Sequence, residues 1–170
     1  MSNNNWLTPP EIFKELDDEF HFDLDPCTTS DNPLGIKHFF TEQEYNGLLM
    51  DWDESVYVNP PYGYNEKNEY LLEKWVKKAY EQITSNSNVK VIVMLVPAAV
   101  STKWFHKYVW NDKYNETLCN TDSDDGILDF NIEIRFPQRR IRYLDKRGEK
   151  RQSPRFDSMI IIYKRFFDDD

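Results

Sequence analysis

One uninterrupted apolar run, residues 90–96, constrains the fold of this chain more than any other feature of the sequence. The run reads Lys-Val-Ile-Val-Met-Leu-Val and shows no alternation of polar and apolar residues. Its β-branched side chains predict a strand buried on both faces, and such strands occur mainly in parallel sheets enclosed by helices. Even when it is extended to Val100, the apolar stretch covers about ten residues and includes Pro97, which is too short for a membrane span.

Helical and strand patterns alternate along the rest of the chain. Apolar residues at spacings of three and four predict a helix over residues 69–83, and Thr8 followed by two prolines predicts the start of another, with Thr8 as its cap. Further segments with such patterns are the strands 20–24, 38–40 and 56–58, the helix 101–110, and the antiparallel strands 131–136, 140–144 and 158–165. Residues 111–129 are polar and are expected to form a surface loop. We therefore predict an open α/β sheet flanked by helices, with an antiparallel hairpin near the C-terminus.

The composition is that of one folded domain, which we predict to span residues 1–170. Hydrophobic residues make up 39% and aromatic residues 15% of the chain, enough to bury a core, and no Pro/Gly/Ser-rich linker divides it. Cys27 and Cys119 lie far apart, with no Cys or His at metal-ligand spacing, so neither a metal site nor a disulfide scaffold is expected. Residues 1–6 lack the basic and apolar regions of a signal peptide, so a cytoplasmic location is expected.

Charge is distributed very unevenly along the chain. The net charge is −9, yet residues 135–155 hold nine of the 21 basic residues and only two acidic ones, which gives this segment +7 and the remainder −16. An acidic chain argues against indiscriminate binding to nucleic acid, whereas a concentrated basic segment can hold phosphates locally. The alternative is a solvated hairpin whose arginines pair with the acidic remainder of the chain. Charge alone does not separate these two interpretations.

The sequence Asn59-Pro60-Pro61-Tyr62 directly follows the strand predicted at residues 56–58. In open α/β sheets, ligands bind at the carboxyl ends of the strands. The Asn side-chain oxygen and the Pro60 carbonyl can both accept hydrogen bonds from an exocyclic amine, which draws the nitrogen lone pair out of conjugation with a nucleobase. The prolines stiffen the backbone, and Tyr62 offers a face on which a base can stack. The simpler alternative is a turn at a strand end, which Asn-Pro-Pro also favours.

Further short motifs occur in order along nearly the whole chain, and together with the tetrapeptide they form a pattern that is much more specific than the tetrapeptide alone. They include Trp6-Leu7-Thr8-Pro9, Phe22-Asp23-Leu24-Asp25-Pro26-Cys27, Asp51-Trp52, Val96-Pro97-Ala98 and Arg140-Ile141-Arg142-Tyr143. With these motifs the chain resembles the phage-encoded DNA N6-adenine methyltransferase (Dam-like) family, whose members use S-adenosylmethionine (AdoMet). The resemblance implies a compact Rossmann-like AdoMet-dependent methyltransferase sheet and methyl transfer to N6 of adenine in double-stranded DNA. It also implies that the target base flips out of the duplex, and that the enzyme works in the host cytoplasm.

The resemblance implies roles for individual residues as well. The catalytic residues it implies are Asn59, Pro60, Pro61 and Tyr62. The residues it implies for AdoMet are Trp6, Thr8 and Pro9 at the methionine end, Asp23, Asp25, Pro26 and Cys27 along the cofactor, and Asp51 and Trp52 near its adenine. Many AdoMet enzymes place glycines after the first strand, but this chain has none directly after Asp25. The candidates for binding the ribose hydroxyls are Glu42 and Glu44.

Asn59 lies only 34 positions after Asp25, which leaves no room for a recognition domain between them. DNA contacts are therefore expected from later segments, namely the loop after Tyr62, residues 111–129 and the basic segment 135–155. The residues predicted to bind DNA are Tyr64, Lys103, Arg139, Arg140, Arg142, Arg147, Lys150 and Arg151.

Other functions stay open at the level of the sequence. Similar motifs occur in enzymes that methylate cytosine N4, RNA adenine or protein glutamine. Cytosine N4 enzymes more often begin the tetrapeptide with Ser, and protein-directed enzymes usually carry a Gly-rich first motif, whereas these residues do not exclude RNA. A non-catalytic module that binds nucleic acid through the basic segment is the alternative from another class, and AdoMet binding distinguishes it from the enzymes.

Overall fold

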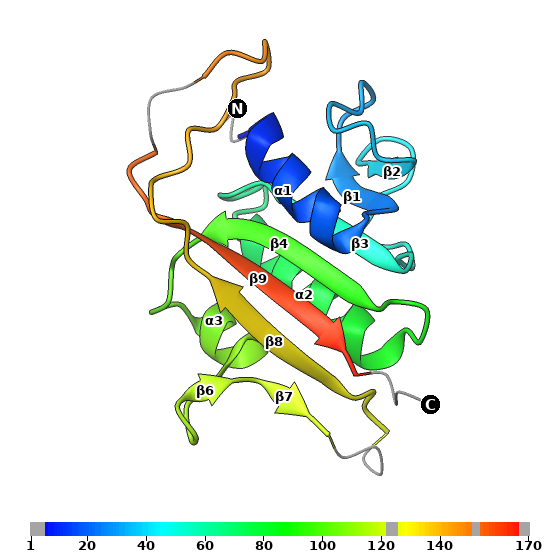
Figure 1. Ribbon diagram of the computed structural model, residues 1–170, viewed down its shortest axis with the longest axis vertical. Coiled ribbons are helices and arrows are strands. Elements are labelled where there is room, and N and C mark those ends of the chain that lie inside the picture. Colours follow the sequence, from blue (N-terminus) through cyan, green and yellow to red (C-terminus); the bar gives the residue numbers. More distant parts are fainter. Residues whose placement is uncertain (1–5, 122–125, 151–153, 167–170) are drawn as a thin grey trace.

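The computed structural model describes residues 6–121, 126–150 and 154–166, which form a mixed α/β fold (Figure 1). Its centre is a seven-stranded sheet in the order β2-β1-β3-β4-β9-β8-β7. The strands are β1 (Leu24–Thr28), β2 (His38–Thr41), β3 (Ser55–Val58), β4 (Val91–Pro97), β7 (Cys119–Asn120), β8 (Phe130–Arg135) and β9 (Ser158–Arg165). The pairs β2-β1, β1-β3 and β3-β4 are parallel, whereas β9 is antiparallel to both β4 and β8. The predicted α/β sheet with an antiparallel pair near the C-terminus is confirmed.

Helices cover both faces of this sheet. Helix α1 (Pro10–Phe20) lies on one face, and α2 (Leu71–Ser85) and α3 (Lys103–Tyr108) lie on the other (Figure 1). Next to α3, β5 (Trp110–Asn111) and β6 (Glu116–Thr117) form a small second sheet. Two clusters of buried side chains fill the layers on either side of the main sheet. No helix in the described ranges has the length and apolar character that a membrane crossing requires.

Strand β4 confirms the interpretation of the apolar run. Residues 92–96 of this strand are completely buried. Ile92, Met94 and Val96 pack in the layer of α2 and α3, whereas Val93 and Leu95 pack in the layer of α1. Each such side chain contributes about 1.5–3 kcal/mol to folding when it is removed from water. Because β4 has apolar side chains on both faces, the sheet is stable only with a helical layer on each side.

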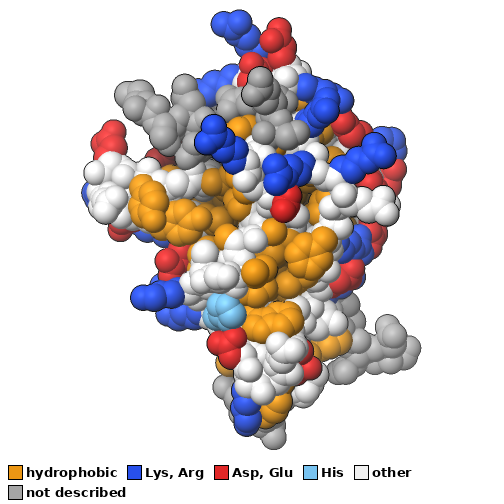
Figure 2. Space-filling view, turned by 90° about the vertical axis from the view of Figure 1, so that its left-hand side faces the viewer, with side chains coloured by type: hydrophobic (Ala, Val, Ile, Leu, Met, Phe, Trp, Pro, Cys, Tyr) orange, Lys and Arg blue, Asp and Glu red, His pale blue; other side chains and the backbone are white. Residues whose placement is uncertain are grey.

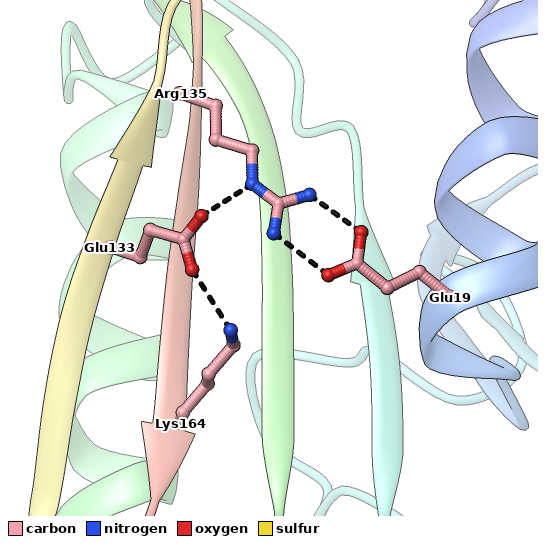
Figure 3. A network of polar contacts seen from close by, with 4 residues as sticks. All are labelled: Glu19, Glu133, Arg135 and Lys164. Carbon is pink, nitrogen blue, oxygen red and sulfur yellow. Dashed lines mark hydrogen bonds and ion pairs between the residues drawn. The ribbon is translucent and has the colours of Figure 1, made fainter.

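Strand β8, the second strand from the edge of the sheet, carries polar side chains on the face toward α1. Arg135 donates two hydrogen bonds to Glu19 of α1, at 2.6 and 2.7 Å, and a third to Glu133, at 2.5 Å (Figure 3). Glu133 also accepts a hydrogen bond from Lys164 of β9, at 2.9 Å. These four side chains link α1 to the antiparallel half of the sheet.

The prediction of a strand at residues 20–24 is wrong. Helix α1 continues to Phe20, His21 follows with a φ of 52°, and β1 begins only at Leu24. His21 is the C-cap of α1 in a left-handed conformation, so the alternation of apolar and polar residues here spans the end of a helix and not a strand. Thr8 also does not cap α1, because the N-cap position is Pro9 and no side chain caps the helix.

The basic segment differs from its prediction too. Residues 140–144 form no continuous strand, and only Leu144 pairs, with Leu7 and with Lys150. Leu7 and Leu144 exchange two backbone hydrogen bonds of 3.0 and 2.9 Å, which tie the basic segment to the start of the chain. Residues 111–129, predicted as a loop, contain β6 and β7 in their described part.

We expect Arg135→Met to lower the free energy of unfolding by about 1 kcal/mol, because Arg135 belongs to a network and its side chain is only 35% exposed. Lys14→Met is the matched control, since Lys14 pairs with Asp18 at 73% and 66% exposure, and we expect almost no loss there. Arg135 lowers the pKa values of Glu19 and Glu133, so its stabilising effect exists above the ordinary carboxylate pKa of 4.5 and disappears as the pH falls through the lowered values. Urea unfolding at neutral and acidic pH measures the difference, and an equal loss at both pH values would contradict this account.

Candidate active site

A cavity of about 760 Å³ opens at the carboxyl edge of the parallel strands. Its walls come from the N-terminal segment and the start of α1, from β1 and the loop after it, from the residues that follow β2 and β3, from α2 and from the basic segment. The carboxyl ends of parallel strands meet at one edge of a sheet, which brings together residues that lie far apart in the sequence. The volume is within the range of about 300–1,000 Å³ that small-molecule sites occupy.

The side chain of Asn59 is held in one orientation at the end of β3. Its Nδ2 donates hydrogen bonds to the Trp6 carbonyl oxygen, at 2.5 Å, and to Thr8 Oγ1, at 3.1 Å. A carbonyl oxygen can only accept, so the amide nitrogen must face Trp6 and the amide oxygen must face away from it. The hydroxyl of Tyr62 lies 2.9 Å from this oxygen. Oδ1 has two acceptor sites, so it can accept a further hydrogen bond.

Tyr62 is buried in the cavity wall, with 7% of its surface exposed. Its hydroxyl also lies 2.9 Å from the Leu95 carbonyl oxygen, and its ring packs edge-on against Tyr143 and Phe156. Burial raises the pKa of Tyr62 well above its ordinary value, so the hydroxyl stays neutral and can donate. Pro60 and Pro61 line the same wall. The structure therefore brings all four residues of the predicted catalytic motif to the cavity.

Asp25 places a buried carboxyl group in the cavity wall. The residue is 4% exposed, and its Oδ1 accepts a hydrogen bond from the Cys27 backbone N–H at 3.1 Å. Burial raises the pKa of Asp25 to about 7. Burial also raises the pKa of the Cys27 thiol, and Asp25 and Glu42 raise it further, so Cys27 remains a neutral thiol. Pro26, between them, lines the cavity as well.

The loop after β2 packs directly against this strand end. A Cβ atom on Gly47 would lie 2.1 Å from the Pro26 carbonyl oxygen, so only glycine permits the contact. The close approach places Glu42 and Leu48 in the cavity wall. Of the two acidic candidates for the ribose hydroxyls, Glu42 lines this cavity, whereas Glu44 is absent from the described residues around it.

Four residues assigned to AdoMet by resemblance are not among the described residues that line the cavity, namely Pro9, Asp23, Asp51 and Trp52. Asp23 precedes β1 at its opposite end, where its carboxylate accepts a hydrogen bond from the Ser55 N–H at 3.0 Å. Trp52 is 2% exposed, donates to the Gly47 carbonyl oxygen at 2.8 Å and stacks on Trp75 in the core. The geometry thus gives Asp23 and Trp52 packing and hydrogen-bonding roles, whereas Trp6 and Thr8 do line the cavity.

The basic segment is divided between pairing with the acidic remainder and exposure to solvent. Arg140 pairs with Asp157 at 2.9 Å, and Lys150 pairs with Glu11 at 3.4 Å. Five other exposed basic residues of this segment form no ion pair with a described acidic side chain, namely Arg139, Arg142, Lys146, Arg147 and Arg155. One face of the molecule gathers Lys and Arg side chains in its upper half, above hydrophobic side chains (Figure 2). The pairing interpretation therefore holds for Arg140 and Lys150, and phosphate binding by the exposed residues stays a prediction.

The predicted DNA-binding residues lie at different distances from the cavity. Arg147 and Tyr64 line it, and Tyr64 is 62% exposed. Lys103 is exposed on α3 and is absent from the described cavity lining. Arg151 lies outside the described residues. Lys146 and Leu144 also line the cavity, which the sequence did not predict. They reach the cavity wall because Leu144 pairs with Leu7, and no local pattern in the sequence indicates this pairing.

The described residues contain no cluster of three or more His, Cys, Asp or Glu side chains that could hold a metal ion. The comparison with known proteins identifies the family of this chain. The family described as DNA N-6-adenine-methyltransferase (Dam) matches residues 1–169. The chain therefore belongs to the Dam family of DNA N-6-adenine-methyltransferases.

A particular relative comes from a bacteriophage. The DNA N-6-adenine-methyltransferase of Haemophilus phage HP1 (strain HP1c1) is 33% identical over 119 residues, which cover 68% of this chain. The match spans 62% of the phage protein's length. No solved structure matches the chain significantly.

We expect Asp25→Asn to raise the free energy of unfolding of the ligand-free protein by about 1–4 kcal/mol at pH 8, with little change at pH 4. The unfolded carboxyl group ionises near its ordinary value of 3.8, whereas the folded group ionises only near pH 7. The free-energy cost of keeping the Asp25 carboxyl group buried is therefore absent below pH 4. It grows as the pH rises and is complete above about pH 7.

The control for this prediction is Asp31→Asn, the same change at an exposed position. Urea unfolding at the two pH values measures both variants. The account of Asp25 is contradicted if Asp25→Asn has the same effect at pH 4 and pH 8, or if it destabilises the protein at pH 8.

Proposed function

We propose that this chain transfers a methyl group from AdoMet to N6 of adenine in DNA. The observation that carries the proposal is the fixed amide of Asn59 in the cavity wall, at the end of β3, in a chain of the Dam family. The parallel strands β2-β1-β3-β4, with helices on both faces, support a Rossmann-like methyltransferase arrangement, because such sheets bind ligands at this edge.

The cavity residues suit the chemistry of this methyl donor. Bound AdoMet supplies a methyl group that its positively charged sulfur already activates. The buried carboxyl group of Asp25 favours a cationic ligand, because a nearby positive charge stabilises its ionised form. Glu42 offers acceptors for sugar hydroxyls, and Pro26 and Leu48 offer apolar surface. The cofactor assignment rests on Asp25, Pro26, Cys27 and Trp6 within the cavity wall.

The remaining task of the protein is to orient the adenine amine. Asn59 Oδ1 and the Pro60 carbonyl oxygen would accept the two N6–H bonds, which turns the nitrogen lone pair toward the methyl group. The new N–CH₃ bond forms as the S–CH₃ bond breaks, and the surplus proton then leaves N6 for water. The amine of a paired adenine cannot enter the cavity, so the base must leave the stack, where the Tyr62 ring lines the wall.

The DNA backbone would lie along the unpaired basic residues near the cavity. Arg147 and Lys146 line its wall, and Arg139 and Arg142 are exposed in the same segment. Arg135 has its guanidinium bound to Glu19 and Glu133, so it is not available to phosphates. Phosphate contacts from this segment would hold the duplex beside the site while the base enters.

We expect Asn59→Ala to lower the kcat of methyl transfer by at least about 100-fold, because the lone pair of the amine loses its orientation. AdoMet binding should stay within about threefold of wild type, since the amide acts on the other substrate. Asn88→Ala, at an exposed turn, is the matched control and should leave both quantities unchanged. Transfer of labelled methyl groups to duplex DNA gives kcat, and isothermal titration gives the affinity for AdoMet. Retention of most activity in Asn59→Ala would overturn the catalytic assignment.

We expect the double variant Arg139→Ala/Arg147→Ala to weaken DNA binding and to reduce the slope of log affinity against log salt by about 1–2. Arg135→Ala removes the same kind of charge from a paired position, and its slope should equal that of wild type. Arg140 is less informative, because its reversal also breaks the ion pair with Asp157. Fluorescence anisotropy with a duplex at several salt concentrations measures the slopes. Equal slopes in the double variant and wild type would place the DNA elsewhere.

A further inference from the structure

We propose that Thr8 is a positioning residue that acts through Asn59, because its hydroxyl oxygen holds the catalytic amide in the orientation that presents Oδ1 to the substrate amine. The inference rests on the proposed methyl transfer and deepens it. It differs from the role that the family resemblance implies for Thr8, which is contact with the methionine end of AdoMet.

Thr8 lies where the N-terminal segment crosses the end of β3. It is 4% exposed, and its Oγ1 lies 2.7 Å from the Tyr57 hydroxyl and 3.1 Å from Asn59 Nδ2. Tyr57 and Asn59 are two residues apart at the end of an extended strand, so their side chains point to the same face. Thr8 therefore joins two successive side chains on that face through one oxygen atom.

The direction of the hydrogen bond between Asn59 and Thr8 follows from chemistry. The Asn59 amide nitrogen can only donate, so Thr8 Oγ1 accepts this bond. Tyr57 is completely buried, and burial raises its pKa, so its hydroxyl keeps its proton. The hydroxyls of Tyr57 and Thr8 share a second hydrogen bond, in which either oxygen can donate. In both cases this bond holds the Thr8 oxygen beside Asn59.

This arrangement fixes the amide of Asn59. Thr8 Oγ1 holds one amide N–H, and the Trp6 carbonyl oxygen holds the other. A rotated amide would place Oδ1 against the Trp6 carbonyl oxygen, which repels it. Without the Thr8 hydroxyl, one N–H in the cavity wall loses its partner, and the amide is free to tilt.

The test compares Thr8→Val, which keeps the shape but removes the hydroxyl, with Thr8→Ser, which keeps the hydroxyl. Thr8→Val should lower kcat by about 10- to 100-fold and leave the AdoMet dissociation constant within about threefold of wild type. Thr8→Ser should restore kcat to within about threefold. Thr84→Val removes another buried hydroxyl, which donates to the Tyr80 carbonyl oxygen at 2.7 Å, and should leave kcat unchanged. A kcat near wild type together with weakened AdoMet binding in Thr8→Val would overturn the positioning role in favour of cofactor contact.

A second readout observes the amide itself and requires no activity. The side-chain N–H signals of Asn59, identified by their loss in Asn59→Ala, are measured by NMR in the ligand-free protein. We expect these protons to exchange with solvent faster in Thr8→Val than in wild type or in Thr8→Ser. Unchanged signals and exchange in Thr8→Val would overturn the inference. If Thr8→Val does not fold, Thr8→Ala replaces it, since that variant also removes the hydroxyl, and unchanged exchange of the Asn59 protons there counts against the inference in the same way.

The experiments distinguish a failure of this inference from a failure of the proposed function. Wild-type protein that transfers no methyl group to DNA would overturn the function, and the NMR comparison would still decide whether Thr8 holds Asn59. Active wild-type protein with a fully active Thr8→Val variant would overturn only the role of Thr8.

Discussion

The burial of β4 on both faces is the constraint on which the rest of the structure depends. Ile92, Met94 and Val96 require cover from α2 and α3, whereas Val93 and Leu95 require cover on the face of α1. The parallel pairing of β4 with β3, and of β3 with β1, then places the carboxyl ends of these strands at one edge. The cavity lies at that edge, so a requirement of the core decides where the site can form.

The site itself is assembled by contacts between distant segments. The Trp6 carbonyl and the Thr8 hydroxyl hold Asn59, and Leu7, between them, pairs with Leu144 of the basic segment. The same short N-terminal segment thus contacts both the amide proposed to orient the substrate and the segment proposed to contact DNA. The buried carboxyl group of Asp25 is a cost to the folded protein that a cationic ligand would remove. Stability is therefore lowered at the position where the proposed cofactor binds, which is common at functional sites.

Local patterns in the sequence predicted the elements whose structure depends on local interactions. The apolar run of β4, the stripe of α2 and the motif after β3 were all located correctly, because burial and periodicity are visible within one segment. Contacts between remote segments were not predictable in this way. Arg135, predicted to be part of the basic segment that holds phosphates, instead pairs with Glu19. Trp52, expected near the adenine of the cofactor, instead packs its indole in the core against Trp75. The strand expected at residues 20–24 failed because alternation also occurs where a helix ends and the chain turns at His21.

The identity of the methylated base tests the central claim most directly. Purified protein is incubated with methyl-labelled AdoMet and unmethylated duplex DNA, and the DNA is digested to nucleosides that are then separated. The account predicts that the label appears in N6-methyladenine, because the Asn59 amide and the Pro60 carbonyl would orient an adenine amine within the cavity. Label in N4-methylcytosine would contradict the assignment of the base, and the absence of label from DNA would contradict the proposed function as a whole.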